Sequence, residues 1–153
     1  MRSKLIKAGE LTALLKALKK KKKKIVFTNG CFDLLHPGHI KLFKESRKHG
    51  DLLIIGLNSD SSIKRLKGKG RPILAQKARV EVLASLDCID FIVIFAQDTP
   101  LRLIAKIKPD VLIKGGDWAR DRIVGRNIAK KVVRVKLRKG HSTTALLKKI
   151  RAS

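Results

Sequence analysis

Acidic residues are scarce in this chain of 153 residues, with twelve Asp and Glu against thirty-seven Lys and Arg. Aromatic residues make up 4% and tyrosine is absent, so side chains on which nucleic-acid bases could stack are few. The two cysteines, Cys31 and Cys88, form neither a metal-binding pattern nor a disulfide framework. No run of about 18 apolar residues occurs, and the N-terminus lacks an apolar segment followed by a cleavage site. We therefore expect a cytoplasmic, single-domain protein with no membrane span.

The excess of basic residues gives a formal net charge of +25 and an isoelectric point near 10.8. Three explanations compete: a nucleic-acid binder that displaces counterions from phosphates, an enzyme for phosphorylated substrates, and drift of the surface composition without a function. Apart from the lysine run at residues 19–24, the basic residues are spread along the chain. A dedicated nucleic-acid tail is usually a separate segment, so we expect non-specific association with nucleic acid instead.

Apolar residues recur along the chain either at helical spacing or in short runs. Helices are predicted at residues 10–19, 40–49, 76–86, 100–107 and 142–150, with a short polar helix at 59–66 and a helix of uncertain start before residue 132. Strands are predicted at residues 25–28, 51–58, 91–95, 111–113 and 132–137. Thr99 is expected to cap the helix that Pro100 begins. Residues 67–71, rich in Lys and Gly, are expected to form a mobile loop.

Alternating strands and helices are typical of a doubly wound α/β fold, here a Rossmann-like parallel five-stranded sheet with helices on both faces. Residues 1–24 are expected to form a helix and a basic connection packed on the domain at residues 25–153. In such a sheet, ligands bind beyond the carboxyl ends of the strands, at the switch point. Polar segments follow four of the predicted strands, at residues 29–39, 58–60, 115–118 and 140–144, and predict a site at that edge.

The first of these segments, with the sequence TNGCFDLLHPGH at residues 28–39, joins a strand to a helix. This arrangement aims backbone N–H groups and a helix N-terminus at an anion. His36 and His39 can donate hydrogen bonds to phosphoryl oxygens and stabilise charge that builds during an in-line attack. Metal ligation by the pair is the alternative, but it lacks a third ligand at standard spacing. The segment therefore predicts a site for a nucleoside triphosphate.

Residues 28–39 resemble the HxGH motif of the nucleotidyltransferase superfamily that includes cytidylyltransferases and aminoacyl-tRNA synthetases. Three further segments narrow the resemblance: residues 58–72 (NSDSSIKRLKGKGRP), residues 95–104 (FAQDTPLRLI), and residues 114–118 (KGGDW) with 140–144 (GHSTT). Together they are similar to the adenylyltransferase domain of bacterial ADP-heptose synthases, over about residues 10–151.

The resemblance implies that an oxygen of D-glycero-β-D-manno-heptose 1-phosphate attacks the α-phosphate of ATP, giving ADP-heptose for the lipopolysaccharide core and pyrophosphate. It implies Mg²⁺ held mainly by the phosphates, a homodimer, and a separate heptose kinase acting upstream; a piece cut from a longer chain is the alternative to a stand-alone transferase. Two other functions stay open. One is transfer from CTP or ATP to another acceptor such as glycerol 3-phosphate, and the other is nucleic-acid binding on the same fold.

The resemblance also implies roles for single residues. Contact with the triphosphate and neutralisation of its charge are expected of His36, His39, Lys64 and Lys67, with the choice between the two lysines open. Nucleotide contacts are expected of Thr28, Asn29, Gly30, Phe32, Asp33, Arg79, Lys114, Gly115, Asp117, Trp118, Ser142, Thr143 and Thr144. Contacts with the sugar substrate are expected of Asn58, Asp60 and Arg71. No direct protein ligand for the metal is expected, except that Asp33 either orients a histidine or approaches Mg²⁺ through water.

Overall fold

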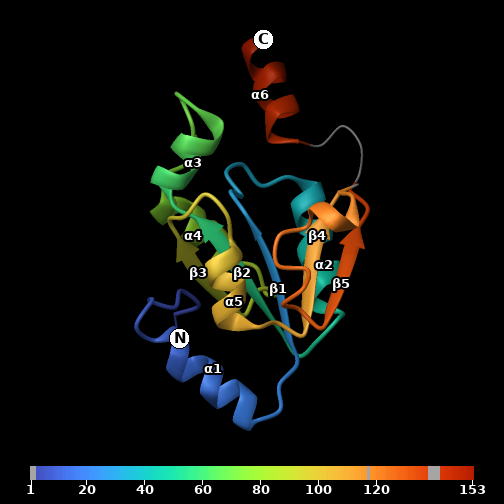
Figure 1. The fold of residues 1–153 in the computed structure, drawn as a ribbon. Helices are drawn as coiled ribbons and strands as arrows, with labels where there is room; N and C mark the ends of the chain where they lie inside the picture. The colour runs from blue at the N-terminus through green and yellow to red at the C-terminus, as the bar shows by residue number, and fades with distance from the viewer. Residues whose placement is uncertain (1–2, 117, 138–141) are drawn as a thin grey trace.

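A computed structural model describes residues 3–116, 118–137 and 142–153. Five parallel strands form one sheet in the order β3-β2-β1-β4-β5 (Figure 1). The strands are β1 (Ile25–Gly30), β2 (Leu52–Asn58), β3 (Phe91–Phe95), β4 (Val111–Gly115) and β5 (Lys131–Val135). Because β1 pairs with β2 on one side and with β4 on the other, the winding direction reverses between β1 and β4. The predicted doubly wound α/β fold is confirmed, and its switch point lies at the end of β1.

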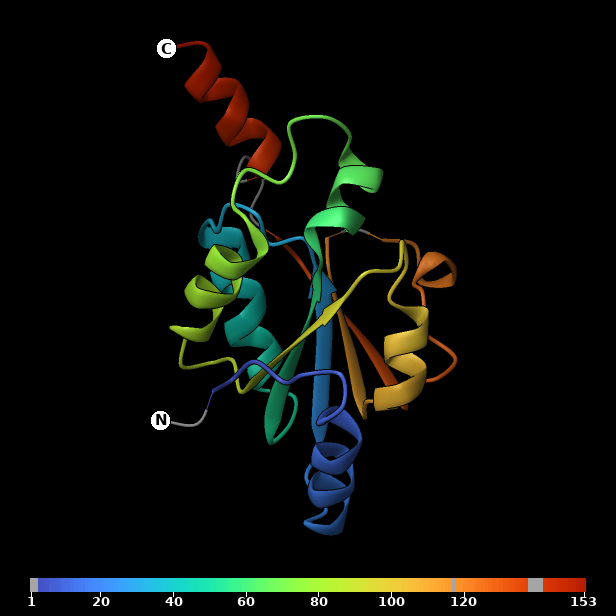
Figure 2. The same ribbon diagram turned by 90° about the vertical axis from the view of Figure 1, so that its left-hand side faces the viewer.

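Helices cover both faces of the sheet (Figure 2). Leucines and isoleucines of α1 (Leu11–Lys20) and α5 (Leu101–Ile107) pack in the core on one face. Residues of α2 (Pro37–Arg47) and α4 (Gln76–Ala84) pack in the core on the other face. β2 lies between the two layers and is buried along its whole length, as its continuous apolar run predicts.

Two further helices, α3 (Asp60–Lys67) and α6 (Thr143–Arg151), stand beyond the carboxyl ends of the strands (Figures 1 and 2). α1 lies at the opposite end of the molecule, below the start of β1. The segment before α1 pairs with the edge of the sheet, because the N–H of Ile92 donates to the Lys4 carbonyl at 2.8 Å and the N–H of Ile6 donates to the Ile92 carbonyl at 2.9 Å. This pairing covers the otherwise open edge of β3.

Some local predictions are wrong. Between residues 118 and 131 the structure has only a 3-10 turn, η1 (Arg120–Arg122), where a helix was expected before β5. Gly125 adopts a left-handed backbone conformation there, with φ at 81°, which interrupts any regular helix. Thr99 does not cap α5, because Pro100 itself occupies the N-cap position and no side chain caps the helix. α2 begins at Pro37, three residues earlier than predicted.

None of the helices within the described ranges has both the length and the apolar character that crossing a membrane requires.

Candidate active site

A cavity of about 640 Å³ opens at the carboxyl end of the sheet, over the ends of β1 and β4. It is bounded by the turn after β1, the end of α3, the loop between β3 and α5, and the start of α6. Most of the residues predicted to form the site line this one cavity: Thr28, Asn29, Gly30, Phe32, Asp33, His36, His39, Asn58, Lys67, Arg71, Lys114, Gly115, Trp118, Ser142, Thr143 and Thr144. Segments distant in sequence therefore converge where the switch-point rule places a ligand.

His36 and His39 lie at the N-terminus of α2, with ring centroids 3.8 Å apart and ring planes 28° apart. His36 is the N-cap residue, and its Nδ1 accepts a hydrogen bond from the N–H of Gly38 at 3.1 Å. An Nδ1 that accepts carries no proton, so the neutral ring of His36 carries its proton on Nε2. The sequence predicted both histidines, but the role of His36 as a helix cap was missed.

His39 is held as a neutral imidazole. Burial lowers its pKa to about 4, with His36 contributing in the same direction, while the Leu34 carbonyl acts to raise it. The Nδ1 atom of His39 is buried and has no hydrogen-bond partner among the described residues. A buried polar atom without a partner at the wall of a cavity is costly unless a ligand supplies the partner.

Phe32 supports the His39 ring from the side. The two rings meet edge to face with 5.3 Å between centroids, and Phe32 also contacts Phe43 of α2 at 4.9 Å. Phe32 has a left-handed backbone with φ at 42°, which most side chains avoid. A Cβ atom on Gly30 would lie 2.9 Å from Cζ of Phe32, so only glycine at residue 30 leaves room for the ring.

Asp33 connects the loop after α3 to the turn between β1 and α2, which leads to His36 and His39 and is called the histidine turn below. Its carboxylate is 2% exposed and accepts hydrogen bonds from Nε of Arg71 at 2.9 Å and from the N–H groups of Ile73 and Leu74 at 2.8 Å. The structure therefore gives this carboxylate a loop-closing task, and the two roles expected from the sequence, histidine orientation or Mg²⁺ approach, stay predictions. The guanidinium of Arg71 is thereby held at the wall of the cavity.

Arg79 does not line the cavity, in contrast to the nucleotide contact expected of it. It is 1% exposed, and its guanidinium donates to the carbonyls of Leu74, Cys31 and Asn58 at 3.1, 2.7 and 2.8 Å. It also forms an ion pair with Asp60 at 2.8 Å. Arg79 thus connects the ends of β1 and β2 to the loop before α4.

Asp60 shares in that structural task. Its second carboxylate oxygen accepts from the N–H of Gln76, the first residue of α4, at 3.1 Å. It does not line the cavity, so the predicted contact with the sugar is not supported by its position. Asn58 does line the cavity, although its amide donates to the Ser62 hydroxyl at 3.0 Å.

Lys67, at the end of α3, lines the cavity, whereas Lys64 lines a separate, shallower hollow beside Asp60 and Arg71. The position of the two side chains favours Lys67 for a contact with phosphate. Lys114 supplies a second cation at the end of β4, where burial lowers its pKa. Its ammonium lies 3.3 Å from Oδ1 of Asn29 and 5.9 Å from the centre of the Trp118 ring. Asp117, predicted beside them, lies outside the described residues.

The start of α6 closes the cavity from the far side. Ser142 caps the helix, because its hydroxyl accepts from the N–H of Ala145 at 3.0 Å. The Thr143 hydroxyl donates to the Leu34 carbonyl at 3.4 Å and so joins α6 to the histidine turn. The helix N-terminus faces the same cavity as the two histidines, an arrangement that favours an anion.

Some residues of the cavity wall were not predicted as site residues. They come mainly from the loop after β3 and from segments near β5: Cys31, Leu42, Leu66, Asp98, Thr99, Pro100, Val124 and Leu137. The strand-end rule, applied to the third strand as well as to the others, would have pointed to residues 98–100. Nothing in the local sequence of Val124 or Leu137 marks them, because their place depends on how the chain returns to β5.

Comparison with known proteins agrees with this geometry. The cytidylyltransferase-like family model matches residues 27–150. The bifunctional protein HldE of Geotalea uraniireducens (strain Rf4) is 51% identical over 145 residues, which cover 92% of this chain and 30% of that protein. The HldE protein of Helicobacter hepaticus is 53% identical over 151 residues, covering 99% of this chain and 31% of that protein. The chain therefore spans less than a third of the length of these curated relatives.

Solved structures share the fold. The lipopolysaccharide core biosynthesis protein of Thermoplasma volcanium GSS1 superposes with a TM-score of 0.65 at 29% identity, over 76% of this chain and 99% of that one. Pantoate-beta-alanine ligase of Francisella tularensis gives a TM-score of 0.70 at 15% identity, over 97% of this chain and 73% of that one, which is a likeness of fold alone.

Proposed function

The chain belongs to the cytidylyltransferase-like family and is a nucleotidyltransferase, and from this premise we propose that it transfers AMP from ATP to D-glycero-β-D-manno-heptose 1-phosphate. The observation that carries the proposal is the stacked pair His36 and His39 at the N-terminus of α2, facing a cavity with cationic walls. Similarity to HldE proteins and to a lipopolysaccharide core biosynthesis protein supports a heptose acceptor.

The proposed reaction is a single displacement at phosphorus. An oxygen of the acceptor phosphate forms a bond to the α-phosphorus of ATP, the bond from that phosphorus to the bridging oxygen breaks, and pyrophosphate leaves with the electron pair. The acceptor phosphate is already ionised at neutral pH, so the step requires no general base and no covalent enzyme intermediate. Catalysis then consists of positioning the two substrates and stabilising the charge that develops.

The two histidines are suited to donate hydrogen bonds in this step. His36 carries its proton on Nε2, and the low pKa of His39 keeps that ring neutral at pH 7. Neutral imidazole N–H groups can bind the oxygens of the α-phosphate as negative charge builds there. Positive charge comes from Lys67, Arg71 and Lys114, and the start of α6 offers N–H groups to the outer phosphates.

The residues present do not form a protein-made site for Mg²⁺. Within the ranges that the structure describes, no three His, Cys, Asp or Glu side chains lie where they could share a metal ion. The Asp33 carboxylate already accepts hydrogen bonds from Arg71, Ile73 and Leu74. We therefore derive no step through a metal bound by the protein; a divalent ion in this reaction would be carried by the triphosphate.

Pyrophosphate release tests the proposal. ATP and CTP would each be combined with heptose 1-phosphate and with glycerol 3-phosphate, and release would be followed continuously. We expect turnover with ATP and heptose 1-phosphate to exceed the other three combinations by at least about tenfold in kcat/KM. A preference for CTP or for glycerol 3-phosphate would overturn the proposed substrates. No turnover with any pair, together with tight, salt-sensitive binding of nucleic acid, would favour the nucleic-acid alternative.

A further inference from the structure

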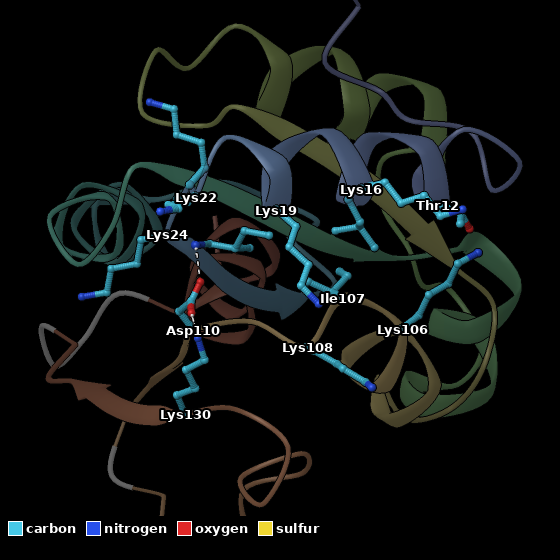
Figure 3. A pocket seen from close by; sticks show the side chains of 13 residues that line it. Thr12, Lys16, Lys19, Lys22, Lys24, Lys106, Ile107, Lys108, Asp110 and Lys130 are labelled. Carbon is cyan, nitrogen blue, oxygen red and sulfur yellow. Dashed lines mark hydrogen bonds and ion pairs between the residues drawn. The ribbon is translucent and has the colours of Figure 1, made fainter.

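A second cavity, of about 620 Å³, lies at the other end of the molecule, between α1, the end of α5 and the start of β1 (Figure 3). We propose that this cavity is a binding site for a compact polyanion that carries several phosphate groups. No residue lines both this cavity and the active-site cavity. The two sites therefore lie at opposite ends of the strands and can be occupied independently.

The walls of the cavity are exceptionally basic. Eight of its thirteen lining residues are lysines, whereas lysine and arginine together make up 37 of 153 residues in the whole chain. The lysines converge from three separate segments, namely α1 with its connection to β1, the end of α5, and the residue before β5: Lys16, Lys19, Lys22, Lys23, Lys24, Lys106, Lys108 and Lys130. Convergence of this kind brings like charges together, which is unfavourable unless an anion offsets it.

The one acid of the cavity wall cannot supply that compensation. Asp110 accepts from the N–H of Ile25 at 2.8 Å and from the ammonium of Lys130 at 2.6 Å, so both of its oxygens are engaged (Figure 3). Among the eight lysines, Lys130 alone forms an ion pair within the described part of the chain. The other seven lysines form no ion pair with a carboxylate of the described residues, and the side chains of Lys22 and Lys106 point outward into solvent (Figure 3).

The backbone at two of these lysines guides the choice of test variants. Lys22 and Lys108 adopt left-handed conformations, with φ at 52° and 49°, where glycine is strongly favoured. Within the described residues, three non-glycine residues have positive φ: these two lysines and Phe32 of the active site. Both lysines lie at the C-terminal ends of helices, α1 and α5, where a left-handed residue commonly ends a helix and a basic side chain lies near the negative end of the helix dipole.

The shape of the cavity favours a small ligand. Its floor is formed by Leu15, Ile25 and Ile107, and a volume of this size is typical of sites that enclose a small molecule. No aromatic side chain lines it, so bases of a nucleic acid would find nothing on which to stack. A compact group of phosphates, surrounded by flexible ammonium groups on several sides, is the occupant that these walls match.

The test uses isothermal titration calorimetry with inorganic tripolyphosphate. The wild-type protein should bind two equivalents, one in each cavity. The double variant Lys22→Gly/Lys108→Gly removes two charges while placing glycine where the backbone favours it, so it should stay folded and melt no lower than wild type. It should weaken one of the two binding events by at least about tenfold and leave the other unchanged.

The matched control is Lys44→Ala/Lys77→Ala, which removes two exposed lysines that line neither cavity. It should retain both binding events. Equal weakening in the control and in the glycine variant would overturn the proposal, since the effect would then be one of overall charge. A single binding event in the wild type, lost in His39→Ala, would also overturn it. The proposal would also be overturned if Lys22→Gly/Lys108→Gly weakened binding of a short DNA duplex but did not weaken binding of tripolyphosphate.

Discussion

At the scale of single residues, we propose different roles for the histidine pair and for the cations around it. Two imidazole rings stacked 3.8 Å apart cannot both carry a positive charge without strong repulsion, and burial disfavours the charged form further. In the proposed reaction, the pair would therefore act as hydrogen-bond donors, while Lys67, Arg71 and Lys114, which line the same cavity, would provide the positive charge.

Replacement of His39 by alanine tests this division directly. We expect kcat for pyrophosphate release to fall by about 10² to 10³, because one donor to the developing charge is lost. The domain should remain folded, as judged by circular dichroism and by a cooperative thermal transition. His49→Ala is the matched control, since His49 lies after α2 and outside the cavity, and it should retain wild-type turnover. Near-normal kinetics of His39→Ala would refute the phosphate role.

The low pKa of His39 predicts how stability depends on pH. Because its pKa is about 4 in the folded chain and about 6.5 in the unfolded one, the unfolded state binds more protons between these values. The contribution of His39 is therefore fully present above pH 6.5 and is lost as the pH falls toward 4. After allowance for partial solvent screening, the loss should be about 1 to 2 kcal/mol in the free energy of unfolding.

Urea unfolding at pH 7 and at pH 4.5 measures this loss. The wild type should lose more stability across the interval than His39→Ala, which lacks the titrating group. Parallel losses in the two proteins would contradict the assigned environment of His39.

At the scale of secondary-structure elements, two buried charged residues hold the loops around the site in place. Arg79 joins β1 and β2 to the loop before α4, and Asp33 holds the loop that carries Arg71. Neither group is exposed enough to act as a mobile ligand for substrate. Their effect on the reaction is to keep the histidine turn and the cationic loop at a fixed distance from each other.

Arg79→Lys should destabilise the fold by about 2 to 4 kcal/mol. Lysine cannot reproduce the planar fork of donors, so at least one of the buried carbonyls of Leu74, Cys31 and Asn58 would lose its partner. Chemical denaturation measures the free energy of unfolding, with Arg102→Lys on the exposed face of α5 as the control. A rise in KM for ATP with unchanged stability would instead support a direct nucleotide contact for Arg79.

The sequence was informative about elements and about the histidine turn. Five strands and most helices follow from apolar periodicity, and residues 28–39 could be recognised because strand, polar turn and helix are contiguous there. The nucleotide contact predicted for Arg79 stays a prediction, because an arginine near a predicted site looks the same in sequence whether it faces a ligand or three backbone carbonyls. Only the packing of α4 against β1 and β2 decides between these, and that packing is non-local. The prediction of a helix before β5 was wrong for a different reason, because the sequence pattern on which it rested was weak.

At the scale of the whole molecule, basic residues are spread along the chain and give a net charge of +25, and some of them line two cavities. The active-site cavity lies beyond the carboxyl ends of the strands, and the lysine-lined cavity lies near their amino ends. A surface of this charge attracts anionic substrates over long distances and at the same time repels itself.

Salt should therefore affect turnover and stability in opposite directions. Raising NaCl from about 0.01 to 0.15 M shortens the Debye length from about 30 to 8 Å. The free energy of unfolding should rise because self-repulsion is screened, while kcat/KM for ATP should fall several-fold because steering is weakened. Lys44→Ala/Lys77→Ala should show both trends with smaller slopes. A kcat/KM that does not change with salt would contradict a role for the overall charge in substrate capture.

The central claim, adenylyl transfer to a heptose 1-phosphate, is tested most directly by following the phosphorus atoms of ATP. The protein would be incubated with heptose 1-phosphate and ATP labelled either at the α- or at the γ-phosphate, and the products separated by chromatography. The account predicts that the α-label appears in ADP-heptose and that the γ-label appears only in pyrophosphate, and that both products form much more slowly with His39→Ala. Appearance of the γ-label in the sugar product, or release of pyrophosphate without an acceptor-linked nucleotide, would contradict it.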